Sequence, residues 1–444
     1  MTDLFDKFNT DGGYFGKQRA AGDMTYTRPV LDPHSGTHML YNGKSHIMWS
    51  VNNYLGLANH PHIIAAAREG LEEYGTANPM GSRMMTGNTH EHLALERELA
   101  RVSQKEAAFL FNYGYLGVIG TIQALAGPDD VIVMDKLSHA CIVDGAFLAP
   151  AQLRVFRHNS PESLEVVLKR VNRDRKGGVL VVTEGVFGMT GDVARLQEIT
   201  RLCREYEARL FVDDAHGWGV MGECGRGSGD FLGVHADIDA YFGTFAKAFA
   251  SIGGFTSSTR AVCEWIAYNA RTQVFAKSLP MLYVKSLQKT LELVEHGEAQ
   301  REAMWANSRA LKNGLRELGY FVGPGESPIC AVFAPIKERS PEEVGMQTVE
   351  YLRNKGIFVT AVVYPVVPLG LSMFRMIPTA AHVESDIAET VAAFAAMRDD
   401  LSLDLSFNDA EMANLKKIYG ERTEDSGWSA GVQGSVEEVL VPER

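Results

Sequence analysis

The stretch Gly243-Thr-Phe-Ala-Lys247-Ala-Phe-Ala-Ser-Ile-Gly-Gly254 places one lysine among small residues. The residues before it, Ala240–Phe245, have the composition of a buried strand, so Lys247 is predicted to follow the end of that strand. An amine held there can form a Schiff base with a carbonyl compound. A lysine in such a turn usually has no catalytic role, so this stretch needs support from a second one.

That support comes from Ala208-Arg-Leu-Phe-Val-Asp213-Asp-Ala-His216, which also has the pattern of a strand. It carries a carboxylate and an imidazole at its C-terminal end. An amine for an aldehyde and an acid for a ring nitrogen are the two protein groups that pyridoxal 5′-phosphate (PLP) chemistry needs. The two stretches together indicate an enzyme that uses PLP.

The composition is that of a soluble globular protein of two or three domains, with 444 residues, 45% hydrophobic and 22% charged. The net charge of −12 gives no basic surface for nucleic acid or for an anionic membrane. Five scattered cysteines without a CxxC pair predict neither a metal site nor disulfides, and they favour a cytoplasmic location. The N-terminus lacks a signal-peptide core, and no transmembrane segment is predicted.

Short β-rich runs alternate with helical segments through the middle of the chain. The predicted strands are Ala107–Asn112, Val131–Asp135, Leu153–His158, Val179–Glu184, Leu210–Asp213 and Ala240–Phe245, with helices including Pro161–Val171 and Arg195–Tyr206 between them. This alternation predicts an α/β fold whose mostly parallel central sheet is covered by helices. Ligands of such sheets bind beyond the carboxyl ends of the strands. We therefore expect Lys247, Asp213, His216 and the loop Phe187-Gly-Met to converge there.

The pattern divides the chain into four parts. These are an N-terminal arm (1–60), a large PLP-binding domain (61–290), a small C-terminal α+β domain (291–400) and an acidic C-terminal extension (401–444). A long helical stretch from Lys285 to about Leu318 is predicted to lead into the small part, which is predicted to have strands at Ile329–Ala334 and Phe358–Tyr364 and helices near Pro341–Lys355 and Glu384–Arg398. The extension is predicted to be a solvated tail with one short helix near Glu411–Ile418.

Together these stretches resemble the α-oxoamine synthases, a fold-type I group of PLP-dependent enzymes, from about residue 25 to about residue 400. The motifs that carry the resemblance are, in the family's order, Asn52-Asn-Tyr-Leu-Gly-Leu, Gly81-Ser-Arg, Leu137-Ser-His139-Ala-Cys-Ile-Val-Asp-Gly145, Val212-Asp213-Asp-Ala-His216, Gly243-Thr-Phe-Ala-Lys247 and Arg375. Within the family, three stretches are most similar to bacterial serine palmitoyltransferases: Lys247-Ala-Phe-Ala-Ser-Ile-Gly-Gly-Phe255, Glu326-Ser-Pro328 and Tyr364-Pro-Val-Val-Pro368.

The resemblance implies catalytic roles for four residues. Lys247 matches the lysine that forms the Schiff base with PLP and shuttles protons. Asp213 matches the acid that keeps the pyridine nitrogen protonated, so that the ring remains an electron sink. His139 matches an imidazole stacked on the cofactor ring, and His216 matches the group that bonds the ring hydroxyl.

Further residues match positions that bind the phosphate and the substrate. For the phosphate they are Gly114 and Tyr115 at a helix N-terminus, the hydroxyl of Thr244, and Ser278 from the neighbouring subunit. Arg375 matches the arginine that binds the substrate carboxylate, where its planar fork suits bidentate pairing. Asn52 is a second candidate on the carboxylate side.

Three positions depart from the family pattern. Ala246 stands where the family usually has serine, which removes one phosphate contact. Gly188 replaces a common serine near the ring hydroxyl. The loop Ala77-Asn-Pro-Met-Gly81 replaces a run of smaller residues beside the expected substrate channel, which leaves the identity of the amino acid open.

The resemblance implies decarboxylative condensation of a small amino acid with a long-chain fatty acyl thioester, delivered by coenzyme A or acyl carrier protein. L-Serine is the first expectation and gives a 3-keto sphingoid-type base. Cysteate, leading to a sulfonolipid base, is the second, and glycine or alanine the third. An aminotransferase on the same fold and a non-catalytic subunit are alternatives, and Lys247 argues against the latter. The family's sites are shared between two chains, so a homodimer is expected.

Overall fold

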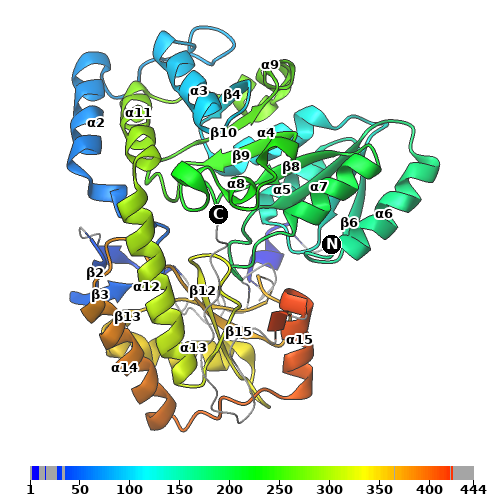
Figure 1. The fold of residues 1–444 in the computed structure, drawn as a ribbon. Helices are drawn as coiled ribbons and strands as arrows, with labels where there is room; N and C mark the ends of the chain where they lie inside the picture. The colour runs from blue at the N-terminus through cyan, green and yellow to red at the C-terminus, as the bar shows by residue number, and fades with distance from the viewer. Residues whose placement is uncertain are drawn as a thin grey trace.

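The computed structural model describes residues 3–9, 16, 28–32, 36–364, 366–420 and 422–423. Two lobes are visible, an upper lobe built on one large sheet and a lower lobe built on smaller sheets (Figure 1). The helix α12 (Glu298–Glu317) runs from the upper lobe down the lower one, so a single element joins the two (Figure 1).

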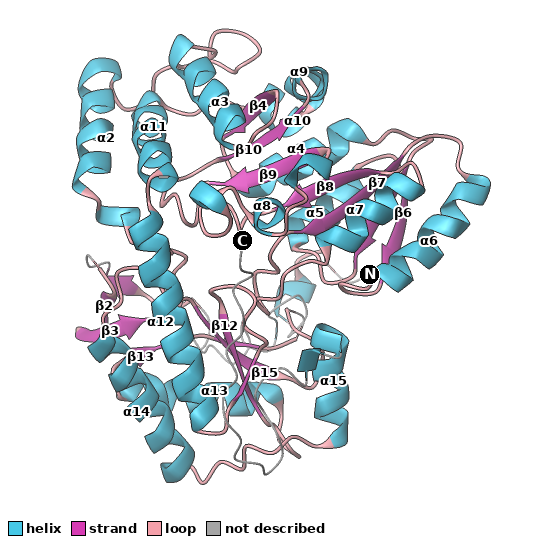
Figure 2. Cartoon of the chain, viewed as in Figure 1, coloured by secondary structure: helices cyan, strands magenta, loops and turns pink. Residues whose placement is uncertain are grey.

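The large sheet has seven strands in the order β4-β10-β9-β8-β7-β5-β6 (Figure 2). The strands are β4 (Ala107–Phe111), β5 (Val131–Asp135), β6 (Gln152–Phe156), β7 (Val179–Glu184), β8 (Arg209–Asp213), β9 (Ala240–Thr244) and β10 (Gly254–Ser258). The strand β10 runs antiparallel to both of its neighbours, β4 and β9, and all other neighbouring pairs in this sheet are parallel. The predicted α/β fold with a mostly parallel sheet is therefore confirmed, and β10 is the one strand of this sheet that the sequence patterns did not predict.

Both faces of the sheet are buried. In β7, Val179 and Val181 belong to the hydrophobic core on one face, and Leu180 and Val182 belong to the core on the other. Because side chains alternate along a strand, a strand covered on both sides is apolar at every position. The sequence Val179-Leu-Val-Val shows this pattern.

The helices of this lobe begin at residues suited to helix N-termini. Pro61 is the first residue of α2, the Thr89 hydroxyl accepts from the His92 N–H at the start of α3, and the Ser160 hydroxyl caps α6. The helices are α2 (Pro61–Tyr74), α3 (His90–Val102), α4 (Gly114–Leu125), α5 (Ala140–Leu148), α6 (Pro161–Asp174), α7 (Leu196–Glu205), α8 (Ser228–Phe231), α9 (Arg260–Asn269), α10 (Arg271–Val274) and α11 (Met281–Glu295). Short 3-10 turns lie at Asp6–Asn9, Leu57–Asn59, Glu223–Gly225 and His235–Asp237.

The helical stretch expected from Lys285 to about Leu318 is divided between two helices. The chain forms α11 and α12, and the helical path breaks at His296-Gly297. Gly297 is the N-cap of α12, and glycine is a poor residue for the interior of a helix.

The lower lobe has two small sheets. One is antiparallel in the order β11-β12-β15-β14, and the other joins the arm strands β1, β2 and β3 to β13. The strands are β1 (Leu31–Asp32), β2 (His38–Tyr41), β3 (Lys44–Met48), β11 (Phe321–Val322), β12 (Cys330–Ala334), β13 (Ile357–Phe358), β14 (Ala361–Val362) and β15 (Ser372–Met376). The stretch predicted as one strand, Phe358–Tyr364, instead divides between the two sheets. Helices α13 (Pro341–Asn354) and α14 (Glu384–Asp400) cover them.

The extension contributes α15 (Asp409–Tyr419), which packs on the lower lobe. Leu415, Ile418 and Tyr419 are buried in the same cluster as Phe321 and Phe333 of the small sheet. The expectation of a solvated tail is therefore wrong for this helix, because one face of it is apolar. Residues 424–444 lie outside the described ranges. No helix within those ranges combines the length and the apolar character needed to cross a bilayer.

Candidate active site

Side chains from four strands of the large sheet meet beyond the carboxyl ends of those strands. His139 lies between β5 and α5, Glu184 and Asp213 end β7 and β8, and Lys247 follows β9. Because β5, β7, β8 and β9 are parallel neighbours, their carboxyl ends share one edge of the sheet. Of the residues predicted from the sequence, the structure brings Lys247, Asp213 and His139 together at this edge.

Lys247 and Asp213 form the charged centre of the site. Burial lowers the pKa of the Lys247 amine, and the nearby Asp213 carboxylate raises it in part. A lowered pKa leaves more of the amine neutral, which both a nucleophile and a general base require. Asp213 is 4% exposed, and one of its oxygens accepts from the Ala215 N–H at 3.2 Å. Burial raises the pKa of this carboxyl, while the nearby Lys247 amine opposes that shift by favouring the ionised form.

His139 is held at the N-terminus of α5. Its Nδ1 lies 2.9 Å from Cys141 Sγ and accepts from the Cys141 N–H at 3.3 Å. Cys141 Sγ lies 3.5 Å from Asp213 Oδ2, so the thiol links the imidazole to the carboxylate. Burial lowers the pKa of His139 although Asp213 raises it, and the ring is neutral near pH 7.

Glu184 is a site residue that the sequence analysis did not single out. Its Oε1 accepts from the His139 N–H at 2.7 Å, and its Oε2 accepts from the Gly188 N–H at 3.3 Å. Burial, with the charge of Asp213, raises the pKa of Glu184 to about 8. Its place at the end of a predicted strand, next to the strand of Asp213, was the signal that could have identified it.

His216 is held between Tyr54 and Gly188. The Tyr54 hydroxyl lies 2.9 Å from His216 Nδ1, and both side chains are buried. A Cβ added at Gly188 would lie 2.3 Å from His216 Nε2. The imidazole therefore occupies the space into which the family's usual serine would project. Burial lowers the pKa of His216 well below its ordinary value, so the ring is neutral. Tyr54 was also missed, although its motif with Asn52 was recognised.

Arg375, on β15, brings the lower lobe into the site. Its Nη2 donates to Asn52 Oδ1 at 3.0 Å, and its Nε donates to the Gly188 carbonyl. No carboxylate of the described residues lies within 4.0 Å of its guanidinium. A largely buried cation without a counter-ion is costly, which suits a site that binds an anion.

The N-terminus of α4 lies close to the end of β9. A Cβ added at Gly114 would lie 2.5 Å from Thr244 Oγ1, so only glycine allows this approach. Tyr115 follows in the first turn, and its ring lies 5.9 Å from that of His139. Within the described ranges, no hydrogen bond joins Ser278 to Thr244 of the same chain. The Ser278 N–H and hydroxyl instead donate to the Gly81 carbonyl at 3.0 and 2.9 Å.

These groups fit PLP. The free N–H groups of a helix N-terminus beside a threonine hydroxyl suit a phosphate, and backbone approaches closely there because Gly114 has no side chain. The buried Asp213 carboxylate suits a protonated ring nitrogen, and Lys247 supplies the amine. Within the described residues, no group of three or more His, Cys, Asp or Glu side chains is arranged to hold a metal ion.

Comparison with known proteins places these residues in a family. The model of the aminotransferase class I and II family matches residues 44–394. A cysteate-C-fatty acyltransferase from Capnocytophaga ochracea is 44% identical over 96% of this chain and 100% of that protein. An 8-amino-7-oxononanoate synthase from Thermoanaerobacter pseudethanolicus is 37% identical over 84% of this chain and 93% of the relative.

The same result comes from solved structures. A variant of serine palmitoyltransferase from S. paucimobilis, solved with PLP and myriocin bound, has a TM-score of 0.84 and 31% identity, covering 90% of this chain and 100% of that one. The sheet, the residues at its carboxyl edge and these relatives agree with one another. This chain therefore belongs to the α-oxoamine synthases, the PLP-dependent acyltransferases of the aminotransferase class I and II family.

Proposed function

We propose that this α-oxoamine synthase condenses L-cysteate with a long-chain fatty acyl thioester, releasing carbon dioxide and the thiol and forming a sulfonated 3-keto long-chain base. The observation that carries this proposal is the 44% identity, over the whole of the relative, to a cysteate-C-fatty acyltransferase. The motifs favoured serine first. The comparisons favour cysteate, because the serine palmitoyltransferase structure is matched at 31% identity.

The site residues support the reaction in the following way. Arg375 and Asn52 bind the α-carboxylate of the amino acid, since Arg375 has no carboxylate partner in the described chain. Lys247 takes the proton from Cα, because burial lowers the pKa of its amine. PLP, when bound, supplies the electron sink for the charge left at Cα. Cα then bonds to the acyl carbon as the C–S bond breaks, and the thiolate takes a proton from solvent and leaves as the thiol. Loss of the carboxylate as carbon dioxide leaves an electron pair at Cα, which takes the proton back from Lys247.

Because the imidazoles of His139 and His216 are neutral, neither forms an ion pair with Asp213. His139 and His216 both have pKa values lowered by burial, so neither ring adds a positive charge that would compete with Lys247 for Asp213. Asp213 is then left to face the ring nitrogen, and His216 Nε2 is free to bond the ring hydroxyl because Tyr54 occupies Nδ1.

We further propose that two chains form the working enzyme. Large exposed apolar side chains lie on segments that meet near the α4 N-terminus, where Gly81 contacts Ser278, Ser82 pairs with Lys277 and Asn112 Nδ2 donates to the Lys277 carbonyl. We call this set the apolar strip: Met80 (73% exposed), Met85 (79%), Tyr113 (55%) and Phe275 (76%). Exposed apolar groups in one region mark a protein interface. A second chain bound at this strip would bring its own residues to the site. Ser278 of that second chain is expected to reach the phosphate in this way.

The proposal is tested by the mass of the product. The purified enzyme, loaded with PLP, is incubated with palmitoyl-CoA or palmitoyl acyl carrier protein and with L-cysteate, L-serine, glycine or L-alanine in turn. We expect the sulfonated product from cysteate, at a kcat/KM at least about tenfold above that with serine, a difference of about 1.4 kcal/mol. Lys247→Ala is the matched inactive control.

Serine is the second candidate, favoured by the motifs and by the fold match to serine palmitoyltransferase. A product from serine alone would replace cysteate by serine while leaving the reaction class unchanged. Amino-group exchange with keto acids, without any acylated product, would contradict the proposed reaction itself.

A further inference from the structure

The loop Phe187–Asp192 connects the active site to a second set of contacts on its far side. At its first end, the Gly188 carbonyl accepts from Arg375 Nε, and the Gly188 Cα lies against the His216 ring. The loop is closed on itself, because the Gly191 N–H donates to the Phe187 carbonyl at 2.9 Å and the Phe187 N–H to the Asp192 carbonyl at 3.0 Å. A displacement of Asp192 is therefore transmitted to Gly188.

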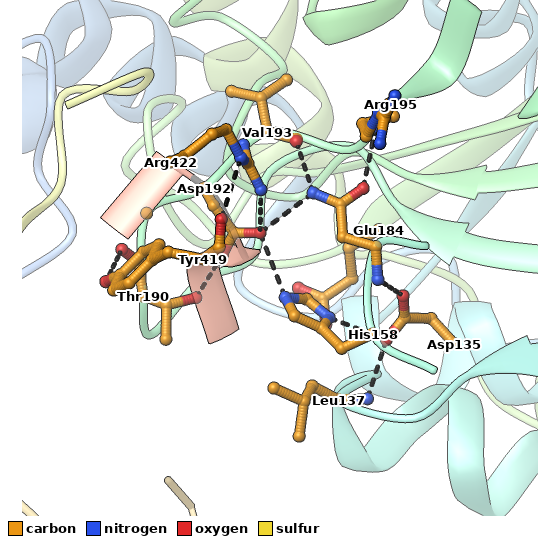
Figure 3. Close-up of polar contacts among 12 residues, drawn as sticks. Asp135, Leu137, His158, Glu184, Thr190, Asp192, Val193, Arg195, Tyr419 and Arg422 are labelled. Carbon is orange, nitrogen blue, oxygen red and sulfur yellow. Dashed lines mark hydrogen bonds and ion pairs between the residues drawn. The ribbon is translucent and has the colours of Figure 1, made fainter. Parts of the chain in front are cut away.

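The far end of this loop is held by the C-terminal extension. The Tyr419 hydroxyl donates to the Thr190 carbonyl at 2.9 Å, and Tyr419 is 1% exposed (Figure 3). Arg422 Nη1 lies 2.5 Å from both carboxylate oxygens of Glu326. Glu326 Oε2 in turn accepts from the Val193 N–H at 3.0 Å, directly after the loop.

The contacts at Asp192 are ionic and buried. Asp192 Oδ2 accepts from His158 Nε2 and from Asn159 Nδ2, each at 3.1 Å, and Arg422 Nη2 lies 3.8 Å from the same oxygen (Figure 3). The Asp192 side chain is 0% exposed and that of Arg422 is 25% exposed. Because charges of this kind are expensive to leave unpaired, the position of Asp192 depends on its cationic neighbours.

We propose that Tyr419 and Arg422 of the C-terminal extension are positioning residues for substrate binding: they hold the loop Phe187–Asp192 so that its Gly188 carbonyl orients the Arg375 guanidinium toward the amino acid carboxylate. This inference rests on the proposed role of Arg375 and is independent of which amino acid the enzyme uses. It gives the extension, which lies beyond the residues 44–394 matched by the family model, a function in the site.

The test uses the PLP-loaded, full-length enzyme and the variants Tyr419→Phe and Arg422→Gln. The dissociation constant of the amino acid is measured from the change in cofactor absorbance, with L-cysteate and L-serine in separate titrations. We expect each variant to raise it by about five- to tenfold, the cost of one misplaced hydrogen bond to a charged group. The KM for palmitoyl-CoA should stay within about twofold, since the inference gives these residues no contact with the thioester.

A second readout does not depend on activity. Hydrogen–deuterium exchange of the peptide covering 187–193 should speed up in both variants, because the contacts of the loop are weakened. The matched control is Arg201→Gln, which breaks an exposed ion pair with Glu205 on α7 and should change neither the exchange nor the dissociation constant.

The outcomes separate this inference from the proposed function. Arg375→Lys should raise the dissociation constant of the amino acid; if it does not, the proposed role of Arg375 fails and this inference fails with it. If Arg375→Lys weakens binding while Tyr419→Phe and Arg422→Gln bind like wild type and exchange like wild type, only this inference is overturned. An equal loss of affinity for amino acid and thioester would also overturn it, because it would indicate general destabilisation. If Arg422→Gln does not fold, Tyr419→Phe, which removes a single hydroxyl, decides.

Discussion

The contact between Gly188 and His216 shows how one missing side chain shapes the site. A Cβ at position 188 would lie 2.3 Å from Nε2 and 2.5 Å from Cδ2 of the imidazole. His216 has little freedom to retreat, because the Tyr54 hydroxyl holds Nδ1 at 2.9 Å and the ring is buried. The glycine is therefore part of how this chain places His216.

We predict that Gly188→Ser lowers kcat/KM at least about tenfold and destabilises the fold by about 1–3 kcal/mol, because the added atoms overpack the site and displace His216. Steady-state kinetics and urea unfolding of the purified variant measure both effects. The control is Gly178→Ser, at an exposed position where a Cβ would lie 3.4 Å from Asp130 Oδ1. Wild-type activity in Gly188→Ser would show that His216 does not need this space.

Single residues could be predicted from the sequence only where the site lies at strand ends. Lys247, Asp213 and His139 follow recognisable strands, so their meeting at one edge follows from the parallel sheet. Tyr54 meets His216 across 162 positions of sequence, and Arg375 meets Asn52 across 323. Such contacts depend on how the two lobes pack, which no local pattern specifies.

Among the elements, the buried cluster around His158 joins the ends of β5 and β6 to the loop before α7. His158 Nδ1 lies 2.9 Å from Asp135 Oδ1, and Nε2 lies 3.1 Å from Asp192 Oδ2 (Figure 3). The centroid of the Phe187 ring lies 4.4 Å from that of His158. Burial alone lowers the pKa of His158, but the two carboxylates outweigh it and raise the pKa to about 10. The more distant charges at this cluster are those of Arg422 and Glu326.

This shift predicts a pH dependence of stability with a definite sign. The pKa of His158 is raised above 6.5, so its contribution to the free energy of unfolding is full below about pH 6.5 and is lost as the pH rises to about 10. His158→Asn should lower the free energy of unfolding by about 3 kcal/mol at pH 6, since two buried carboxylates lose their partner. The difference between wild type and variant should shrink toward pH 10.

Urea unfolding at several pH values measures this difference, with the exposed His62→Gln as control. A difference that stays constant from pH 6 to pH 10 would contradict the ionised state of His158.

The sequence predicted neither this cluster nor β10. The strand β10 escaped because Gly254-Phe-Thr-Ser-Ser258 lacks branched apolar residues, and the 2.7 Å contact of its buried Thr256 hydroxyl is made with Thr121, far away in the sequence.

At the scale of the whole molecule, the site lies where the two lobes meet. The upper lobe supplies Lys247, Asp213 and His139, and the lower lobe supplies Arg375 on β15. The overall α/β architecture was predictable, because apolar runs such as Val179–Val182 in the strand Val179–Glu184 and capped helices are local signals. The packing of α15 was missed because it depends on the core of the lower lobe.

The apolar strip gives a prediction about assembly. Phe275→Asp should convert a dimer into monomers, because a charge within an apolar interface is not solvated after association. Sedimentation velocity measures the change, and activity should fall at least about tenfold, since each site would lose the partner chain. The control is Val166→Asp on α6, which is also exposed (48%) but lies outside the strip. A wild-type enzyme that is monomeric and fully active would contradict the shared site.

The central claim is that Lys247 holds PLP while Asp213 faces its ring nitrogen, and one measurement tests it most directly. The PLP-loaded enzyme is reduced with borohydride and digested, and the modified peptide is sequenced by mass spectrometry. We expect the reduced cofactor to be attached to Lys247, and Lys247→Ala to carry none. Attachment to a different lysine, or an unmodified Lys247 in active enzyme, would contradict it.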